Sequence, residues 1–219
     1  MRYKDLCLDA VDAEASGRFW AAALGLRLER RGDHVVLLDG VDEHTVWVNQ
    51  VAEPVTVKQR VHLDLHVGAV AELVALGATV LDDTLPWTLM RDPEGGELCA
   101  FVRQPPALPS YRLYEVVVDA VDHRAAADWW GSVFGVAAEH DEQPFSGLSA
   151  VPGMPFELVF QSVPEPKTVK NRVHWDLWGD TADLLAAGAR LLRAVDQETD
   201  WDVLADPEGN EFCVFRPTG

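Results

Sequence analysis

The sequence is poor in cysteine, in basic residues and in long apolar runs, and each shortage excludes a class of protein. Its 219 residues include three cysteines, Cys7, Cys99 and Cys213, and no CxxC pair, which excludes a disulfide framework or a structural zinc knuckle. Lys and Arg number 18 against 36 Asp and Glu, and the net charge of −18 would repel a phosphate backbone or an anionic membrane surface. We therefore expect no nucleic-acid partner and no membrane partner.

The N-terminal region also lacks the features of a targeting signal. Asp5 and Asp9 interrupt it before an apolar segment can form, so no signal peptide is expected. No uncharged apolar run approaches the roughly 18 residues that a membrane-spanning helix requires. Together with the scattered cysteines, these absences predict a cytoplasmic protein.

Two stretches of sequence occur twice. Residues 56–65, TVKQRVHLDL, return as residues 168–177, TVKNRVHWDL. The turn sequence DPEG stands at residues 92–95 and again at residues 206–209, where it is followed by similar apolar residues. Because the offset between the copies is nearly constant, the two halves are predicted to be copies of one fold.

A proline-rich segment separates the two copies. Residues 103–109, RQPPALP, contain prolines that cannot continue a sheet and are typical of a linker. With 48% hydrophobic residues, the chain has enough apolar material for a folded core on both sides of this segment. We therefore expect two tandem domains, residues 1–105 and 108–219.

The hydrophobic pattern predicts an α+β fold in which each half consists of two βαβββ modules, four modules in all. Apolar and polar residues alternate in the expected strands, and Asp12 and Gly25 are suitable caps for a helix between them. Helix and strand signals then repeat in the same order. The strands expected in the first half are 3–9, 26–31, 34–38, 45–51, 61–67, 79–82, 86–91 and 97–102, and a second, short helix is expected at 69–76.

One face of the strand at 61–67 is apolar and the other is polar. Leu63 and Leu65 share the apolar face, whereas His62 and Asp64 share the opposite one. Since one helix covers only one side of its sheet, we expect the apolar face to meet the helix and the histidine to face a concavity. The polar residues that both copies share are Arg60, His62 and Asp64 in the first, and Arg172, His174 and Asp176 in the second.

Two interpretations of these polar residues are open. They could contact a ligand, because a face that mixes His, Asp and aromatic residues suits a pocket with a few polar groups. Alternatively, Arg60 could pair with Asp64, and Arg172 with Asp176, in ion pairs of purely structural value.

The motifs resemble the vicinal oxygen chelate superfamily, which includes glyoxalase I, extradiol dioxygenases and bleomycin- and fosfomycin-resistance proteins. The resemblance is to its glyoxalase-like domains and depends on FW with LG at residues 19–25, RVHxDL at 60–65, and W with DPEGxELC at 87–99. Each motif has a counterpart in the second half. The resemblance implies paired βαβββ modules that form a U-shaped sheet around a cavity.

The resemblance also implies positions for a metal site. Those positions are Asp5, His62 and Cys99 in the first half, with Asn49 nearby, and Glu115, His174 and Cys213 in the second, with Gln161 nearby. The family's final glutamate is cysteine in both copies, a set that Zn²⁺ accepts and that Mg²⁺ or Mn²⁺ disfavours. The alternative is that the cysteines are buried as small apolar residues. With one histidine per site, glutathione-dependent glyoxalase I and extradiol dioxygenase activities are not expected.

Two functions follow as hypotheses. The first is a binding protein of the resistance type that sequesters a small planar or cationic molecule, as a monomer or homodimer. Its candidate contacts are Trp47, Trp87, Trp178 and Trp201, with Arg60, Asp64, Arg172 and Asp176. The second is a lyase or isomerase, in which Glu115 or Asp5 would be the general base and His62 or His174 would stabilise an oxyanion, directly or as a zinc ligand.

Overall fold

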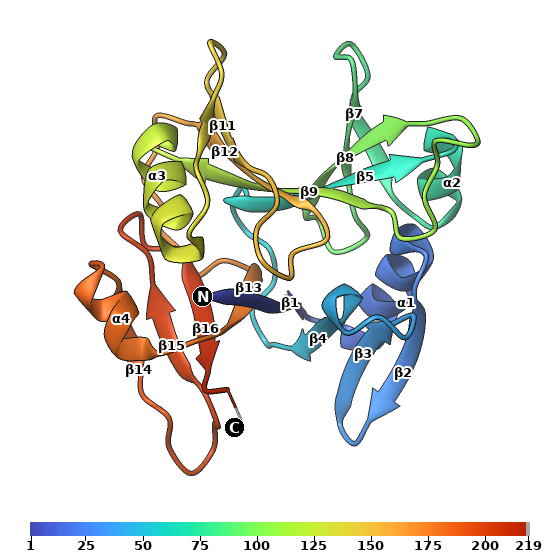
Figure 1. The fold of residues 1–219 in the computed structure, drawn as a ribbon. Helices are drawn as coiled ribbons and strands as arrows, with labels where there is room; N and C mark the ends of the chain where they lie inside the picture. Colours follow the sequence, from blue (N-terminus) through green and yellow to red (C-terminus); the bar gives the residue numbers. More distant parts are fainter. Residues whose placement is uncertain (218–219) are drawn as a thin grey trace.

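The computed structural model describes residues 1–217, which form two eight-stranded sheets and four α-helices (Figure 1). We call them the terminal sheet, which holds both ends of the chain, and the central sheet. The terminal sheet has the order β14 (Arg190–Arg193), β15 (Asp202–Ala205), β16 (Glu211–Phe215), β13 (Val173–Trp178), β1 (Arg2–Ala10), β4 (Val46–Gln50), β3 (His34–Leu38) and β2 (Arg27–Arg31). The central sheet has the order β10 (Glu139–His140), β11 (Phe145–Leu148), β12 (Glu157–Ser162), β9 (Leu113–Ala120), β5 (Val61–Val67), β8 (Glu97–Val102), β7 (Thr88–Arg91) and β6 (Thr79–Asp82).

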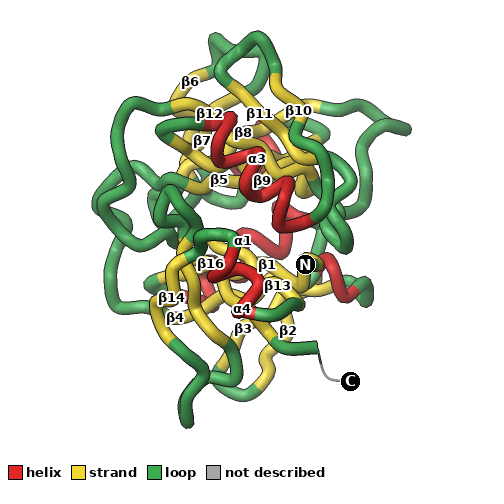
Figure 2. The backbone as a smooth tube through the Cα atoms, turned by 60° about the vertical axis from the view of Figure 1, so that its left-hand side comes forward, coloured by secondary structure: helices red, strands yellow, loops and turns green. Residues whose placement is uncertain are grey.

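The predicted α+β fold of four βαβββ modules is confirmed. The helices are α1 (Ala13–Leu24), α2 (Val70–Ala75), α3 (His123–Phe134) and α4 (Thr181–Ala186), one in each module, and a short 3₁₀ turn covers Asp42–His44. In Figures 1 and 2, strands β5–β12 gather in one half of the molecule and the remaining strands in the other. No helix in residues 1–217 is long and apolar enough to cross a membrane.

Each sheet combines one module from each half of the sequence. The first module joins the fourth through the antiparallel pair β1 and β13, and the second joins the third through β5 and β9. The colours of Figure 1 show this exchange, because blue and red strands share one sheet while green and yellow strands share the other. The division into residues 1–105 and 108–219 follows the repeats and stays a prediction, whereas each sheet contains strands from both sides of it.

The helix ends follow from local sequence. The Asp12 side chain accepts a hydrogen bond from Ala15 N at 2.9 Å, and Gly25 has a φ of 77°, a left-handed conformation that favours glycine. Helix α3 repeats both caps with Asp122 and Gly135. The capped helices pack on their own modules, α1 against β2, β3 and β4 and α3 against β11 and β12.

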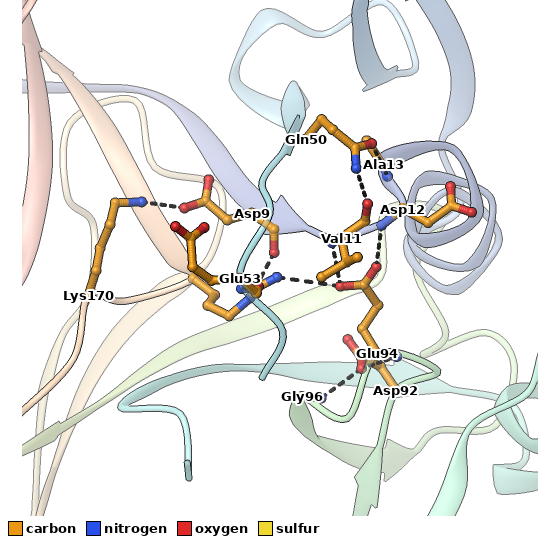
Figure 3. A network of polar contacts seen from close by, with 11 residues as sticks. Asp9, Val11, Asp12, Ala13, Gln50, Glu53, Asp92, Glu94, Gly96 and Lys170 are labelled. Atoms are coloured by element: carbon orange, nitrogen blue, oxygen red, sulfur yellow. Dashed lines mark hydrogen bonds and ion pairs between the residues drawn. The ribbon is translucent and has the colours of Figure 1, made fainter. Parts of the chain in front are cut away.

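The glutamate of each DPEG turn connects the two sheets. Glu94, at the β7–β8 turn of the central sheet, accepts hydrogen bonds from Val11 N at 2.8 Å and Asp12 N at 2.7 Å, directly before α1 (Figure 3). In the second repeat, Glu208 accepts equivalent bonds of 3.0 Å from the two backbone N–H groups that precede α3. The duplicated motif thus joins the second module of each repeat to the first.

Candidate functional site

The central sheet lines a cavity of about 610 Å³. Strands β5, β8, β9, β11 and β12 contribute to its walls, and the segment from Glu139 to Glu142 borders it. The aromatic surface of the cavity comes from Trp87, Phe101 and Tyr114. Its acidic or metal-binding side chains include His62, Asp64, Cys99 and Glu115. The site therefore offers both apolar surface and a small number of polar groups, as ligand pockets do.

Alternation on β5 determines which side chains reach the cavity. His62 and Asp64 line it, whereas Leu63 and Leu65 are fully buried in the core on the opposite face. The predicted orientation of the strand at 61–67 is thus the observed one. On the neighbouring strand β8, Cys99 and Phe101 face the same cavity.

A β-bulge in β9 brings two consecutive residues to the cavity. Asp64 pairs with Glu115 and Leu65 pairs with Leu113, so that Tyr114 is an extra residue in the ladder. Both Tyr114 and Glu115 line the cavity as a result. Sequence reasoning missed Tyr114 because strict alternation places it on the face opposite Glu115.

Two carboxyl groups of the site, those of Asp64 and Glu115, lie opposite each other on β5 and β9. Burial, and secondarily the charge of Asp64, raises the pKa of Glu115 to about 7. Burial, and then the same aspartate, raises the pKa of Cys99, so its thiol is protonated at neutral pH. The pKa of Tyr114 is raised to about 12, chiefly by burial. A carboxyl group that titrates near neutral pH inside a cavity is suited to general acid–base chemistry.

His62, Asp64 and Cys99 fit the requirements of a zinc site. Each offers one ligand atom, and these atoms lie within 4.8 Å of one another. His62 Nδ1 and Asp64 Oδ1 are buried without a hydrogen-bond partner, which leaves both able to coordinate. Nitrogen, oxygen and sulfur donors together are typical zinc ligands. The site fits Zn²⁺ better than Mg²⁺, because a thiol is a poor magnesium ligand.

The terminal sheet carries the second copy of these residues. Cys7, His174 and Asp176 form its potential metal-binding group, and all three are buried. Burial and the charge of Asp5 raise the pKa of Asp176, whereas burial lowers the pKa of His174. Cys7 Sγ lies 3.7 Å from Asp176 Oδ2, and the repeats do not point to it, because the corresponding residue of the second repeat, Val117, is apolar.

The structure regroups the predicted site residues across the repeats. Glu115 does not join His174 and Cys213 of its own half, because β9 pairs with β5 while β13 pairs with β1. The central sheet instead brings Glu115 to His62, Asp64 and Cys99, and the terminal sheet brings Asp5 to His174, Asp176 and Cys213. The grouping by repeat is corrected in this way, and the role of each residue stays a prediction.

The two predicted arginines lie away from the cavity of the central sheet. Arg60 donates to the backbone oxygen of Glu165, and Arg172 donates to that of Asp9 at 3.1 Å. Arg172 also lies 3.5 Å from Glu94. Both arginines border a separate cavity of about 490 Å³ between the repeats. The ion pairs with Asp64 and Asp176, which were the structural alternative, do not form among residues 1–217, and both arginines donate to backbone oxygen atoms instead.

The four candidate tryptophans are divided unequally between the sheets. Trp87 lines the central cavity and stacks on Phe101 with ring centroids 5.7 Å apart. The other three lie at the terminal sheet, where Trp47 donates to Asp5 at 3.1 Å and Trp201 stacks on Phe215. Trp178 lies nearby on β13. The central cavity therefore keeps one tryptophan, together with Phe101 and Tyr114.

The chain is similar to known proteins in sequence pattern and in fold. The family described as glyoxalase-like domain matches residues 5–101 and 115–215. Glyoxalase I from Zea mays is 12% identical with a TM-score of 0.68, over 97% of this chain and 91% of that chain. A dioxygenase candidate from Bacillus subtilis subsp. subtilis str. 168 is 13% identical with a TM-score of 0.68, over 100% of this chain and 86% of that chain. No curated protein sequence matches the chain.

Proposed function

The chain belongs to the family of glyoxalase-like domains, and from this premise we propose that the central cavity binds and sequesters a small organic molecule. The observation that carries the proposal is a cavity of about 610 Å³ that combines the rings of Trp87, Phe101 and Tyr114 with the carboxyl groups of Asp64 and Glu115. Stacked rings favour a planar ligand, and acidic groups favour a cationic one. The role is of the resistance type, in which binding alone lowers the concentration of free ligand.

Calorimetric titration with a panel of planar aromatic compounds tests this proposal. We expect one binding site per chain and at least a tenfold loss of affinity in Trp87→Ala. The matched control is Trp201→Ala, which changes the equivalent tryptophan of the terminal sheet and should leave the affinity intact. A panel in which no compound binds would contradict the proposal.

A second candidate is a lyase or isomerase, favoured by the pKa of about 7 of Glu115. In its ionised form Glu115 would take a proton from a carbon next to a carbonyl group, and His62 would donate a hydrogen bond to the developing oxyanion. If zinc is bound by His62, Asp64 and Cys99, it would supply Lewis-acid polarisation of the carbonyl oxygen. We place sequestration before the lyase or isomerase because the aromatic side chains of the cavity would contribute to binding, whereas proton transfer does not require them.

Metal analysis and product analysis separate the two candidates. Protein purified without chelator should contain about one zinc per chain if the central site is a metal centre, and Cys99→Ala should lose it. Cys213→Ala is the matched control in the terminal sheet. Metal-free protein that binds its ligand without forming product would support sequestration. A monomeric or homodimeric state and a cytoplasmic location remain predictions of the proposal.

A further inference from the structure

The terminal copy of the site contains an ammonium group of the protein itself. Lys4 is the extra residue of a bulge in β1, because the register shifts between Tyr3 and Asp5. Its Nζ atom lies 2.5 Å from Asp5 Oδ2 and 4.0 Å from Asp176 Oδ2. The same atom lies 4.1 Å from the ring centroid of Phe215. One cation is thus held between two carboxylates and an aromatic ring.

The central copy has the same surroundings without the lysine. Tyr114 takes the bulge position of Lys4, and Glu115 faces Asp64 across β9 and β5 as Asp5 faces Asp176 across β1 and β13. Phe101 is the counterpart of Phe215, because each stands two residues after the shared cysteine on the last strand of its module. The two copies therefore share the facing carboxyl groups and the phenylalanine, whereas the internal cation, the Trp47 hydrogen bond to Asp5 and Cys7 belong to the terminal copy alone.

The two carboxylates of the central copy have no lysine or arginine partner among residues 1–217. Asp64 Oδ1 lies 3.3 Å from His62 Nε2 and makes no hydrogen bond, and Glu115 forms no ion pair. The guanidinium group of Arg103 lies over Phe101 and Tyr114, at 5.7 and 5.8 Å from their ring centroids, and forms no ion pair with either acid. Like charges opposite each other in a sheet are unfavourable, so a cation supplied from outside would stabilise this pair.

We propose that the ligand of the central cavity carries an organic ammonium group that takes the place, between Asp64, Glu115 and Phe101, that Lys4 Nζ takes in the terminal copy. This inference rests on the proposed function, since it names the chemical class of the molecule that the cavity binds. The cavity of about 610 Å³ leaves room for a planar or apolar body attached to the amine, with Trp87 as a further wall.

The test compares two probes of nearly equal shape, 2-phenylethylammonium and 2-phenylethanol, by calorimetry at pH 8. We expect the ammonium to bind at one site per chain at least tenfold more tightly than the alcohol. Glu115→Gln should remove most of this difference, because it takes away one of the two charges that the ammonium group contacts. Equal or tighter binding of the alcohol by the unaltered protein would overturn the inference and leave the proposed function intact. If neither these probes nor the neutral planar panel bind, the proposed function fails as well.

The lysine itself provides an independent test. Lys4→Ala should create a second ammonium site, so that the stoichiometry rises from one to two and 2-phenylethylammonium raises the melting temperature more than the alcohol does. Lys4→Tyr, which places the residue type of the central copy in the terminal one, serves if the alanine variant does not fold. A folded variant that still binds one ammonium per chain would overturn the inference that the ligand takes the place that Lys4 Nζ takes in the terminal copy.

Discussion

Glu115 is the residue whose protonation reports most directly on the central cavity. Its folded-state pKa of about 7 lies above the ordinary glutamate value of 4.5, so the folded protein binds a proton that the unfolded chain has lost between these pH values. Stability should therefore fall as pH rises from about 4.5 to 7. The groups that raise this pKa after burial itself are Asp64 on β5 and Glu157 on β12, while the Tyr114 hydroxyl lowers it.

We predict that Glu115→Gln is more stable than the unaltered protein at pH 8, by about 1–2 kcal/mol after allowance for solvent screening. At pH 5 the difference should nearly vanish, because Glu115 is then protonated in the folded protein. Urea unfolding at the two pH values measures both quantities. A difference that is equal at pH 5 and pH 8 would rule out Glu115 as the titrating group.

Lys4 is expected to have the opposite effect on stability. Replacing it with Met leaves Asp5 and Asp176 facing each other without their cation, in a site where both aspartates are at least 94% buried. The loss should be about 2–4 kcal/mol near neutral pH, and smaller as pH falls, because the raised pKa of Asp176 lets this carboxyl group take up a proton above the ordinary aspartate value and end the repulsion. Denaturant unfolding of Lys4→Met at pH 7 and pH 3.5 checks this expectation. Arg27→Met, an exposed change on β2, is the control.

At the scale of elements, the DPEG turns contribute to stability through their glutamates. Glu94→Ala removes the acceptor of two backbone N–H groups directly before α1, which should lower the free energy of unfolding by about 1–3 kcal/mol. Glu208→Ala should have an effect of similar size before α3. Thermal unfolding of both variants tests the prediction, with the exposed Glu198→Ala as control. An effect no larger than that of the control would assign the motif a different role.

Most elements could be predicted from the sequence because they depend on local patterns. The alternation at 61–67 and the caps at Asp12 and Gly25 determine a strand and a helix without reference to the rest of the chain. The bulges at Lys4 and Tyr114 could not be predicted, since each depends on the register of a partner strand that is distant in the sequence. The site was therefore predicted in its alternating residues, such as His62, and missed at Tyr114.

At the scale of the whole molecule, the pairing of modules could not be predicted from the repeats. Copies of a sequence reveal equivalent residues, but they do not reveal whether a module joins its neighbour or a distant copy. The predicted site of Glu115 with His174 and Cys213 was incorrect for this reason, because Glu115 belongs to the sheet of His62. Long-range strand pairing, and not local propensity, decides the composition of each cavity.

The exchange of modules predicts how the separate halves behave. In a fragment of residues 1–107, β1 and β5 lack their partner strands β13 and β9, and each exposes an unpaired edge. We expect fragments 1–107 and 108–219 to self-associate or aggregate when alone, and to form a 1:1 complex with the spectrum of the intact chain when expressed together. Size-exclusion chromatography with light scattering measures this. Halves that are folded monomers on their own would contradict it.

The bulged strands β1 and β9 have an evolutionary consequence. Each site takes residues from both repeats, and the two sites share no side chain, so a substitution at one site leaves the side chains of the other unaltered. Duplication followed by such independent change permits a division of labour. In this protein one copy pairs its acids with Lys4, whereas the acids of the other copy are proposed to pair with a ligand from solution.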